Sequence, residues 1–470
     1  MKKFLVMTSL LLLLCSSCFR QEVKEGGYAK DFRELLVKTY GLNTDGYDFY
    51  KNSAFDSKGN LYVAGNFKTS ILVDGNLYSV RDGDFSDIAL WKVSPDGDIA
   101  WVKIFSSLSA DNVRAVSVDE NDFIYLGGQY KSDILFDDIL LTEETGGTSA
   151  FLARLTTDGE VLWAKSFTSS GINNFQIVEF DILSTGNIVF TGKSANPTLF
   201  YNGEAFHSTG SENVIVGEIT PHGDPVWIKQ IAGSSAFLVG ISIKADSQGN
   251  VYISGRLDGP VTFNGKTDEA EFIKGMFVAK YSSMGEEQWI YRPTVTSTGW
   301  AWDLEVDDED NVYVGSLFTG DITLPSGEAF TSAGNQDGLL LKLDGKGNLM
   351  WSKQLGASSF DVIYNLCLFE KNIYVSGTTS AGFNYDGSFY SVTNSSNRSS
   401  YLLSVKSSDG SAVKFYENSG SGDVYGRSIM SYGGYIYQMG GYKNDFVDLN
   451  NRTHAAHTSE GGVFMMRLLL

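Results

Sequence analysis

Histidines and acidic side chains are the groups in this chain best suited to metal binding or proton transfer. His454 and His457 stand three positions apart, a spacing that brings two zinc-binding imidazoles together when both lie on one helix. The flanking residues predict a loop, so no metal site is predicted there. Acidic clusters at residues 82–87 and 307–311 offer oxygen ligands, but neither has the spacing of a calcium-binding loop. We therefore expect both clusters to be solvated turns.

Aromatic side chains form the second group of candidates, because flat rings beside hydroxyl or carboxamide groups suit a sugar or a peptide. The candidates lie in segments that connect apolar runs, and they are Tyr47, Trp300, Trp302, Phe360 and Tyr425. Trp300 and Trp302 are the least usual, since the corresponding segments elsewhere contain no tryptophan. The alternative is that these rings pack between structural units near the ends of the loops.

Sequence signatures of common catalytic sites are not found. The chain contains no Gly-x-Ser-x-Gly, no phosphate-binding loop and no His-Glu-x-x-His. Its 56 aspartates and glutamates offer too many combinations for a catalytic pair to be recognised. No catalytic residue and no cofactor are predicted. The net charge of −20 disfavours nucleic acid as a partner, because an acidic surface repels phosphate backbones.

The first 30 residues are typical of a targeting segment. Two lysines precede an apolar run, residues 4–14, that is too short to span a bilayer comfortably. The run ends in LCSSC, which resembles a bacterial lipoprotein signal, where the lipid-bearing cysteine follows small residues. Cys18 fits this rule better than Cys15, so residues 1–17 are the predicted signal peptide and residues 18–30 a polar tether. The alternative is an ordinary secretory signal cut near the same place.

Cys367 is the only cysteine outside this segment. It lies between two leucines in an apolar run, which indicates a small buried hydrophobic residue. No disulfide framework is therefore possible within the folded part.

A repeat organises the remaining chain. Its clearest copy, residues 249–255, reads Gly-Asn-Val-Tyr-Ile-Ser-Gly, in which a turn glycine precedes a β-branched and aromatic run. Neighbouring copies lie 61 to 64 positions apart. Their aligned residues are Tyr62, Tyr125, Val189, Tyr252, Tyr313, Tyr374 and Tyr437. So regular a period indicates a repeat architecture rather than several separate domains.

A second signature follows each copy except the last, and consists of a glycine turn and then, in most units, a tryptophan. Each unit therefore holds four strands, predicted in the second unit at residues 113–118, 123–130, 151–155 and 161–167. Four antiparallel strands cannot bury both faces alone, whereas units packed radially around an axis bury them. The repeated tyrosines and tryptophans are interpreted as packing between units.

The two ends of the chain complete one unit. The final unit ends at its third strand, so its fourth strand is missing from the C-terminus. Residues 36–40 match the pattern of residues 101–105, the fourth strand of the first full unit. We therefore expect this N-terminal strand to complete the seventh unit and close the ring.

The combined pattern resembles the seven-bladed β-propeller repeat family of bacterial secreted proteins. It reads Gly-Asn-aliphatic-Tyr-aliphatic-x-Gly, then an Asp-Gly turn and Trp-x-Lys, over residues 31–470. The copies depart from it at Val189 and at Lys414, which replaces tryptophan. The resemblance implies an all-β, seven-bladed propeller of four-stranded antiparallel blades in an extracytoplasmic setting. It implies no catalytic residues, because the motif is structural.

Loop lengths predict which face of such a propeller acts. Tight turns lie on one face, which we call the tight-turn face. Longer connections between second and third strands, together with the inter-blade loops, lie on the other, which we call the long-loop face. Functional loops are expected on the elaborated side of a rigid scaffold, here near the central channel.

The predicted function is a lipid-anchored binding or interaction module of the bacterial cell envelope. Its expected place is the outer membrane, facing the periplasm or the cell surface. Its ligand is expected to be a protein or a glycan, and the chain a monomer or part of an envelope assembly. The alternative is a propeller enzyme that acts on extracellular glycans or peptides, with its acids spread over several blades.

Overall fold

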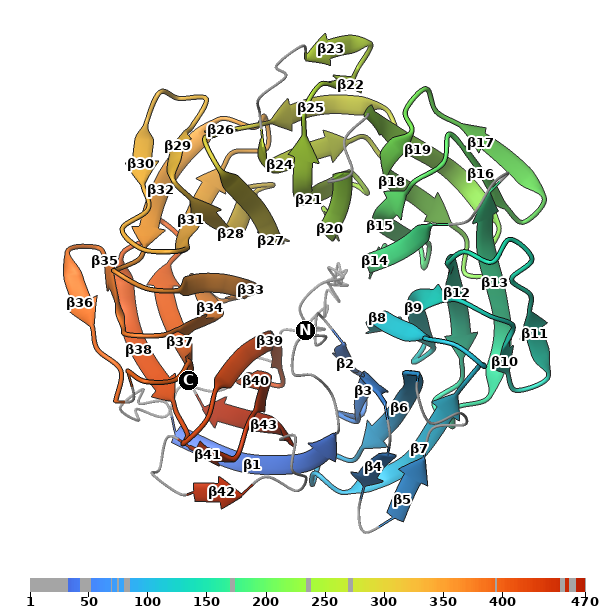
Figure 1. The fold of residues 1–470 in the computed structure, drawn as a ribbon, viewed down its shortest axis with the longest axis horizontal. Helices are drawn as coiled ribbons and strands as arrows, with labels where there is room; N and C mark the ends of the chain where they lie inside the picture. Colours follow the sequence, from blue (N-terminus) through green and yellow to red (C-terminus); the bar gives the residue numbers. More distant parts are fainter. Residues whose placement is uncertain are drawn as a thin grey trace, which may run out of the picture.

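The strands of this chain form blades that follow one another around a central axis (Figure 1). The computed structural model describes residues 33–42, 52–68, 70–73, 76–79, 85–169, 174–233, 238–268, 274–393, 395–448, 453–455 and 462–469. All regular elements in these ranges are β-strands. The same ranges contain no helix long and apolar enough to cross a membrane. The predicted all-β propeller is confirmed.

Each blade is built on four antiparallel strands, with the first nearest the axis and the fourth at the rim (Figure 1). In the first three blades these are β2 (Ser53–Phe55), β3 (Leu61–Phe67), β6 (Asp87–Val93), β7 (Ile99–Phe105); β8 (Asn112–Val118), β9 (Ile124–Tyr130), β12 (Ser149–Leu155), β13 (Val161–Ser169); and β14 (Phe175–Ile182), β15 (Ile188–Ser194), β18 (Glu212–Ile219), β19 (Pro225–Gly233). In the next three they are β20 (Leu238–Ala245), β21 (Val251–Asp258), β24 (Lys274–Tyr281), β25 (Glu287–Tyr291); β27 (Thr298–Val306), β28 (Val312–Thr319), β31 (Asp337–Leu343), β32 (Leu349–Leu355); and β33 (Asp361–Phe369), β34 (Asn372–Thr379), β37 (Ser399–Lys406), β38 (Ala412–Asn418). The last blade has β39 (Val424–Tyr432), β40 (Tyr435–Tyr442), β43 (Gly462–Leu469) and β1 (Arg33–Leu42).

The core lies between the blades. One buried cluster joins Tyr62 and Leu90 of the first blade to Val113, Leu126 and Phe151 of the second. Each blade therefore buries its apolar faces against its neighbours, as the repeat predicts. In the second blade, every predicted strand boundary lies within two residues of the observed one.

The N-terminal strand β1 closes the ring. It pairs antiparallel with β43 and so supplies the fourth strand of the last blade. Its register places Leu36 opposite Arg467, as the first blade places Trp101 opposite Lys92. The predicted completion of the last blade by the N-terminal strand is confirmed.

The long connections between second and third strands form hairpins rather than open loops. The hairpin strands are β4 (Ser70–Val73), β5 (Asn76–Ser79), β10 (Ile134–Phe136), β11 (Ile139–Leu141), β16 (Thr198–Tyr201), β17 (Glu204–His207), β22 (Val261–Phe263), β23 (Lys266–Asp268), β29 (Asp321–Thr323), β30 (Ala329–Thr331), β35 (Phe383–Tyr385), β36 (Ser388–Tyr390), β41 (Asp445–Val447) and β42 (Thr453–Ala455). Several extend the preceding blade: β4 pairs with β1, β16 with β13 and β22 with β19, while β29 pairs with the short β26 (Thr294–Val295). These connections therefore join neighbouring blades, so much of the long-loop face serves the scaffold.

The tight turns fix the repeated tyrosine. In the fourth blade, the Asp246 carboxylate accepts hydrogen bonds from the backbone N–H groups of Gln248 and Asn250 at 3.0 and 2.8 Å, and from the Tyr252 hydroxyl at 3.2 Å. Burial, with Asp246 nearby, raises the pKa of Tyr252, so its hydroxyl remains a donor. In three other blades, the hydroxyls of Tyr62, Tyr125 and Tyr313 donate an equivalent hydrogen bond to the aspartate of their own tight turn. These tyrosines are structural, as interpreted from the repeat.

Candidate functional site

The innermost strands share one irregularity, a β-bulge at the same place in the repeat. It is present in β8, β14, β20, β27, β33 and β39, where the Cα pairing with the second strand skips one residue. The bulge residues are Arg114, Val178, Ile241, Trp302, Tyr364 and Arg427. The corresponding position of the first blade lies outside the described residues. Because these strands surround the axis, the bulges form an arc around it (Figure 1).

Three neighbouring bulge residues contact one another across blade boundaries. Trp302 of the fifth blade lies against Tyr364 of the sixth, with ring centroids 6.0 Å apart and planes at 66°. The Arg427 guanidinium of the seventh blade lies over the same tyrosine, 3.9 Å from the ring centroid. The bulges thus bring side chains of three blades into one series of contacts.

This series extends from Trp302 to the fourth blade. Trp300 and Trp302 stack with centroids 5.5 Å apart and planes within 15° of parallel. The Arg256 guanidinium lies 4.7 Å from the Trp300 ring and donates hydrogen bonds of 2.8 and 2.7 Å to the Asp258 carboxylate. Because Asp258 balances the charge of Arg256, this end of the series is electrically neutral.

The other end passes from Arg427 to Tyr425, Arg398 and Phe360. Both arginines lie near the Tyr425 ring, Arg427 at 5.3 Å and Arg398 at 5.6 Å from its centroid. The Arg398 guanidinium lies 4.3 Å from the Phe360 ring and donates to the Tyr425 hydroxyl at 3.3 Å. The Tyr425 hydroxyl donates to Asp423 at 2.9 Å. Tyr425 is only 1% exposed, so it positions the arginines rather than presenting a free face.

We call the whole series the aromatic–arginine cluster. Its members are Arg256, Trp300, Trp302, Phe360, Tyr364, Arg398, Tyr425 and Arg427. Four of the five aromatic candidates predicted from the sequence therefore lie together. The fifth, Tyr47, and the predicted lipidation site, Cys18, lie outside the described residues.

Sequence reasoning missed Tyr364 and the arginines of this cluster. Tyr364 and Arg427 stand just before the buried run of each innermost strand, where other blades carry Val178 and Ile241. Comparing the repeats at that one position would have shown that its chemistry changes from apolar to aromatic and basic. Arg398 carries no such signal, because it lies outside the repeated pattern.

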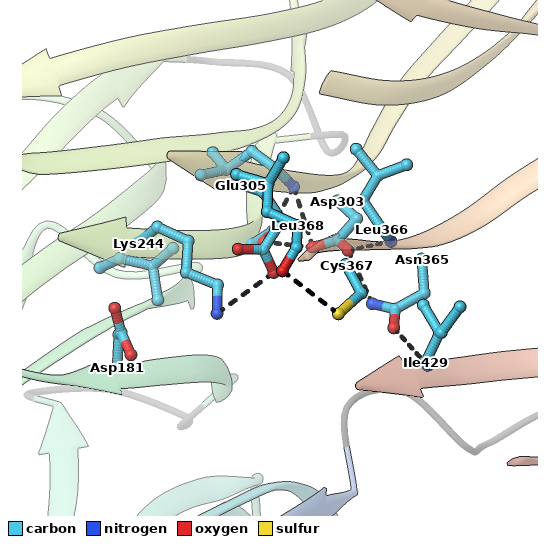
Figure 2. Close-up of polar contacts among 12 residues, drawn as sticks. Asp181, Lys244, Asp303, Glu305, Asn365, Leu366, Cys367, Leu368 and Ile429 are labelled. Carbon is cyan, nitrogen blue, oxygen red and sulfur yellow. Dashed lines mark hydrogen bonds and ion pairs between the residues drawn. The ribbon is translucent and has the colours of Figure 1, made fainter. Parts of the chain in front are cut away.

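Beyond the bulges, polar side chains join each innermost strand to the next. Each of these side chains accepts a hydrogen bond from a backbone N–H group on the innermost strand of the following blade. That N–H group is thereby satisfied at the inner edge of its strand. The bonds run from Ile243 to Glu179 at 3.3 Å, Leu304 to Ser242 at 3.3 Å, Leu366 to Asp303 at 2.6 Å and Ile429 to Asn365 at 2.7 Å. Figure 2 shows the last two. We call these four bonds the axial clasps.

Lys244 adds an ion pair to the axial clasps. Its Nζ atom lies 3.4 Å from the Glu305 carboxylate of the next blade (Figure 2). Burial lowers the pKa of Lys244, but the carboxylates of Glu305 and Asp181 raise it more, so it lies well above its usual value. Lys244 therefore stays charged, and the carboxylates around it act as partners in the scaffold.

The predicted metal candidates find ordinary partners. His454 shares a hydrogen bond of 2.8 Å with Asp448, while His457 lies outside the described residues. In the 307–311 cluster, the Asp307 carboxylate accepts from its own turn and from the Tyr313 hydroxyl. Within the part of the chain that the structure describes, no three histidines, cysteines or acids are grouped to hold a metal. Cys367 is 6% exposed, as a small buried residue should be, and its thiol lies 3.8 Å from the Leu368 carbonyl oxygen.

Comparisons with known proteins found solved structures of distant similarity. No protein-family model matches the chain. No curated protein matches it either. Quinohemoprotein alcohol dehydrogenase from Comamonas testosteroni is similar at 9% identity over 93% of this chain and 76% of that chain, with a TM-score of 0.44. Sqt1 from Chaetomium thermophilum is similar at 9% identity over 91% and 99%, with a TM-score of 0.42. A protein from Lactobacillus plantarum is similar at 11% identity over 78% and 83%, also with a TM-score of 0.42.

Proposed function

We propose that this chain is a lipid-anchored protein of the bacterial cell envelope that binds a protein or glycan at the axial end of its long-loop face. The observation that carries the proposal is the aromatic–arginine cluster, whose residues come from four successive blades and do not repeat. Residues that differ between repeats but meet on a rigid scaffold are what a binding site requires. The lipid anchor and the envelope location rest on the leader sequence.

The engaged acids near the axis favour binding over catalysis. Glu179 and Asp303 accept backbone hydrogen bonds, and Glu305 pairs with Lys244. A propeller enzyme acting on extracellular glycans or peptides, which is the alternative, needs a carboxylate able to exchange a proton with its substrate. These three acids are occupied in holding blades together.

The test removes the tryptophan pair of the cluster. Pull-down from envelope extracts and a glycan array identify the ligand of the full chain. The double variant Trp300→Ala, Trp302→Ala is then expected to bind that ligand at least about tenfold more weakly, because aromatic anchors dominate binding energy. Thermal melting of the variant separates lost contacts from lost folding.

A matched control lies on the opposite face. Met284 is 77% exposed in a tight turn, so Met284→Ala should leave both binding and melting unchanged. Unchanged ligand binding by the tryptophan double variant, with unchanged melting, would exclude this site.

A further inference from the structure

Arg427 is a buried cation against which the described residues place no carboxylate. It is 6% exposed, and its Nε atom is buried with no hydrogen-bond partner. In the described part of the chain its recorded interactions are with the rings of Tyr364 and Tyr425. A guanidinium carries several N–H donors, and leaving even one of them unpaired away from water is unfavourable. The Arg427 guanidinium therefore has donor capacity that an anion from outside the chain can use.

Arg398 provides a second positive charge beside the first. Its guanidinium donates to the Tyr425 hydroxyl, and the described residues place no ion-pairing carboxylate against it. The Asp423 carboxylate accepts hydrogen bonds from the Arg398 backbone N–H group at 3.0 Å and from the Tyr425 hydroxyl at 2.9 Å. By contrast, Arg256 at the far end of the cluster is paired with Asp258. Two arginines without a direct ion pair among the described residues thus lie on either side of one tyrosine, with the Asp423 carboxylate nearby.

We propose that Arg427 and Arg398 form an anion site for the carboxylate of an acidic sugar, a uronic acid unit of a glycan. The proposal rests on the proposed function and names the ligand of that site. The planar fork of a guanidinium matches the two oxygens of a carboxylate, and ring contacts with Tyr364, Tyr425 and Phe360 fix where each fork lies.

The charge of the whole protein favours isolated carboxylates. Two arginines can offset one or two negative groups, whereas a densely charged polyphosphate would meet the repulsion of a surface with 20 excess negative charges. An oligouronate carries one carboxylate per sugar ring, with neutral hydroxyl groups between the charges, and so meets less repulsion than a polyphosphate.

The axial clasps favour a sugar over a peptide. An extended peptide binds by adding a strand, for which it needs free backbone groups at a sheet edge. The inner-edge N–H groups of Ile243, Leu304, Leu366 and Ile429 are already used by side chains of the preceding blade. Recognition at the axis therefore depends on side chains, which suits a sugar carboxylate.

Calorimetric titration of the full chain with three probes tests the proposal. The probes are an oligogalacturonate, a neutral galactose oligosaccharide of equal length and a glutamate-rich peptide. We expect the oligogalacturonate to be the only probe that binds the native protein. Its affinity for the Arg427→Gln and Arg398→Gln variants should be lower by roughly tenfold or more. Arg427→Lys should lose most of this affinity as well, because it keeps the charge and removes the fork.

Arg467 provides the matched control. It is a half-buried arginine beside Tyr435 near the tight-turn face, so Arg467→Gln should leave affinity unchanged. Arg427→Gln removes an unpaired buried charge, and it should therefore melt no lower than the native protein. A lowered melting temperature with unchanged uronate affinity would show that Arg427 serves packing, and would overturn the proposal.

The remaining outcomes separate the two proposals. No binding of oligogalacturonate, or preference for the peptide, overturns the sugar carboxylate. If the array ligand is neutral and its binding depends on Trp300 and Trp302 but not on Arg427, the proposed function stands and this inference fails. If its binding depends on none of the three residues, both fail.

Discussion

Asp303 shows how one carboxylate can hold three blades together. It is fully buried in the innermost strand of the fifth blade. It accepts hydrogen bonds from the Ser242 hydroxyl of the fourth blade at 2.9 Å and from the Asn365 amide of the sixth at 2.7 Å. It also accepts hydrogen bonds from the backbone N–H groups of Leu304 and Leu366 at 2.8 and 2.6 Å. A buried carboxylate is tolerated because donors satisfy both of its oxygens.

Asp303→Asn should therefore destabilise the ring although the side chain keeps its size. The amide replaces one acceptor oxygen with a donor, which then faces donors of the neighbouring blade. Leaving such groups unsatisfied costs about 2–4 kcal/mol of unfolding free energy. Urea denaturation measures this loss, and Asp308→Asn in an exposed turn is the control. An equal effect of the two substitutions would contradict a structural role for Asp303.

At the scale of the element, the tryptophan of one blade covers the glycine turn of the next. The Trp351 indole donates its Nε1–H to the Ser407 carbonyl at 3.3 Å. A Cβ atom added at Gly410 would lie 2.9 Å from the Trp351 ring. The repeated glycine is therefore needed for two reasons: it leaves room for the tryptophan, and it adopts the φ of 71° that the turn requires. This pairing explains why Lys414 replaces the tryptophan in the sixth blade. The third and fourth strands of the next blade, β43 and β1, are not joined by a turn, so there is no glycine turn for a tryptophan to cover.

Those repeated contacts are why the scaffold could be predicted from the sequence and the site only in part. Spacing revealed the blades, the closing strand and the structural role of Tyr252 and its equivalents. The bulge itself could not be predicted, because it is a shift of one residue in the backbone pairing, and Arg427 is recognisable only when the repeats are compared at that one position. The hairpins were predicted as functional loops, since sequence length cannot distinguish an open loop from strands paired with the preceding blade.

The seam between the last and first blades lacks the packing tryptophan. The backbone register places residue 36 at the tryptophan position of the repeat. A cavity of about 190 Å³ lies between the last and first blades, lined in part by Pro95, Gly97, Tyr437 and Arg467. Leu36→Trp should fill this cavity and raise the unfolding free energy by about 1–2 kcal/mol, as burying added apolar surface does. Thermal melting measures the gain. A tryptophan variant that melts no higher than the native protein would contradict this account of the seam.

At the scale of the whole molecule, the closing strand links the fold to the proposed anchor. β1 begins at Arg33, opposite Leu469, which in turn pairs with Tyr435 beside a tight turn. It ends at Leu42, which pairs with the first hairpin on the long-loop side. β1 therefore begins at the tight-turn face. A lipid at Cys18 would leave the long-loop face free to point away from the membrane, toward its ligand.

Lipidation of Cys18 can be tested with the neighbouring cysteine as its control. Several acyl chains anchor a protein firmly, so the native chain should enter the detergent phase of a Triton X-114 partition and incorporate labelled fatty acid. Cys18→Ser should move the protein to the aqueous phase and abolish the label, whereas Cys15→Ser should change neither. Because the anchor is outside the ring, the soluble Cys18→Ser protein should keep its ligand affinity and its melting temperature. Loss of the label in Cys15→Ser alone would move the lipid to that residue, and loss in neither variant would favour an ordinary secretory signal.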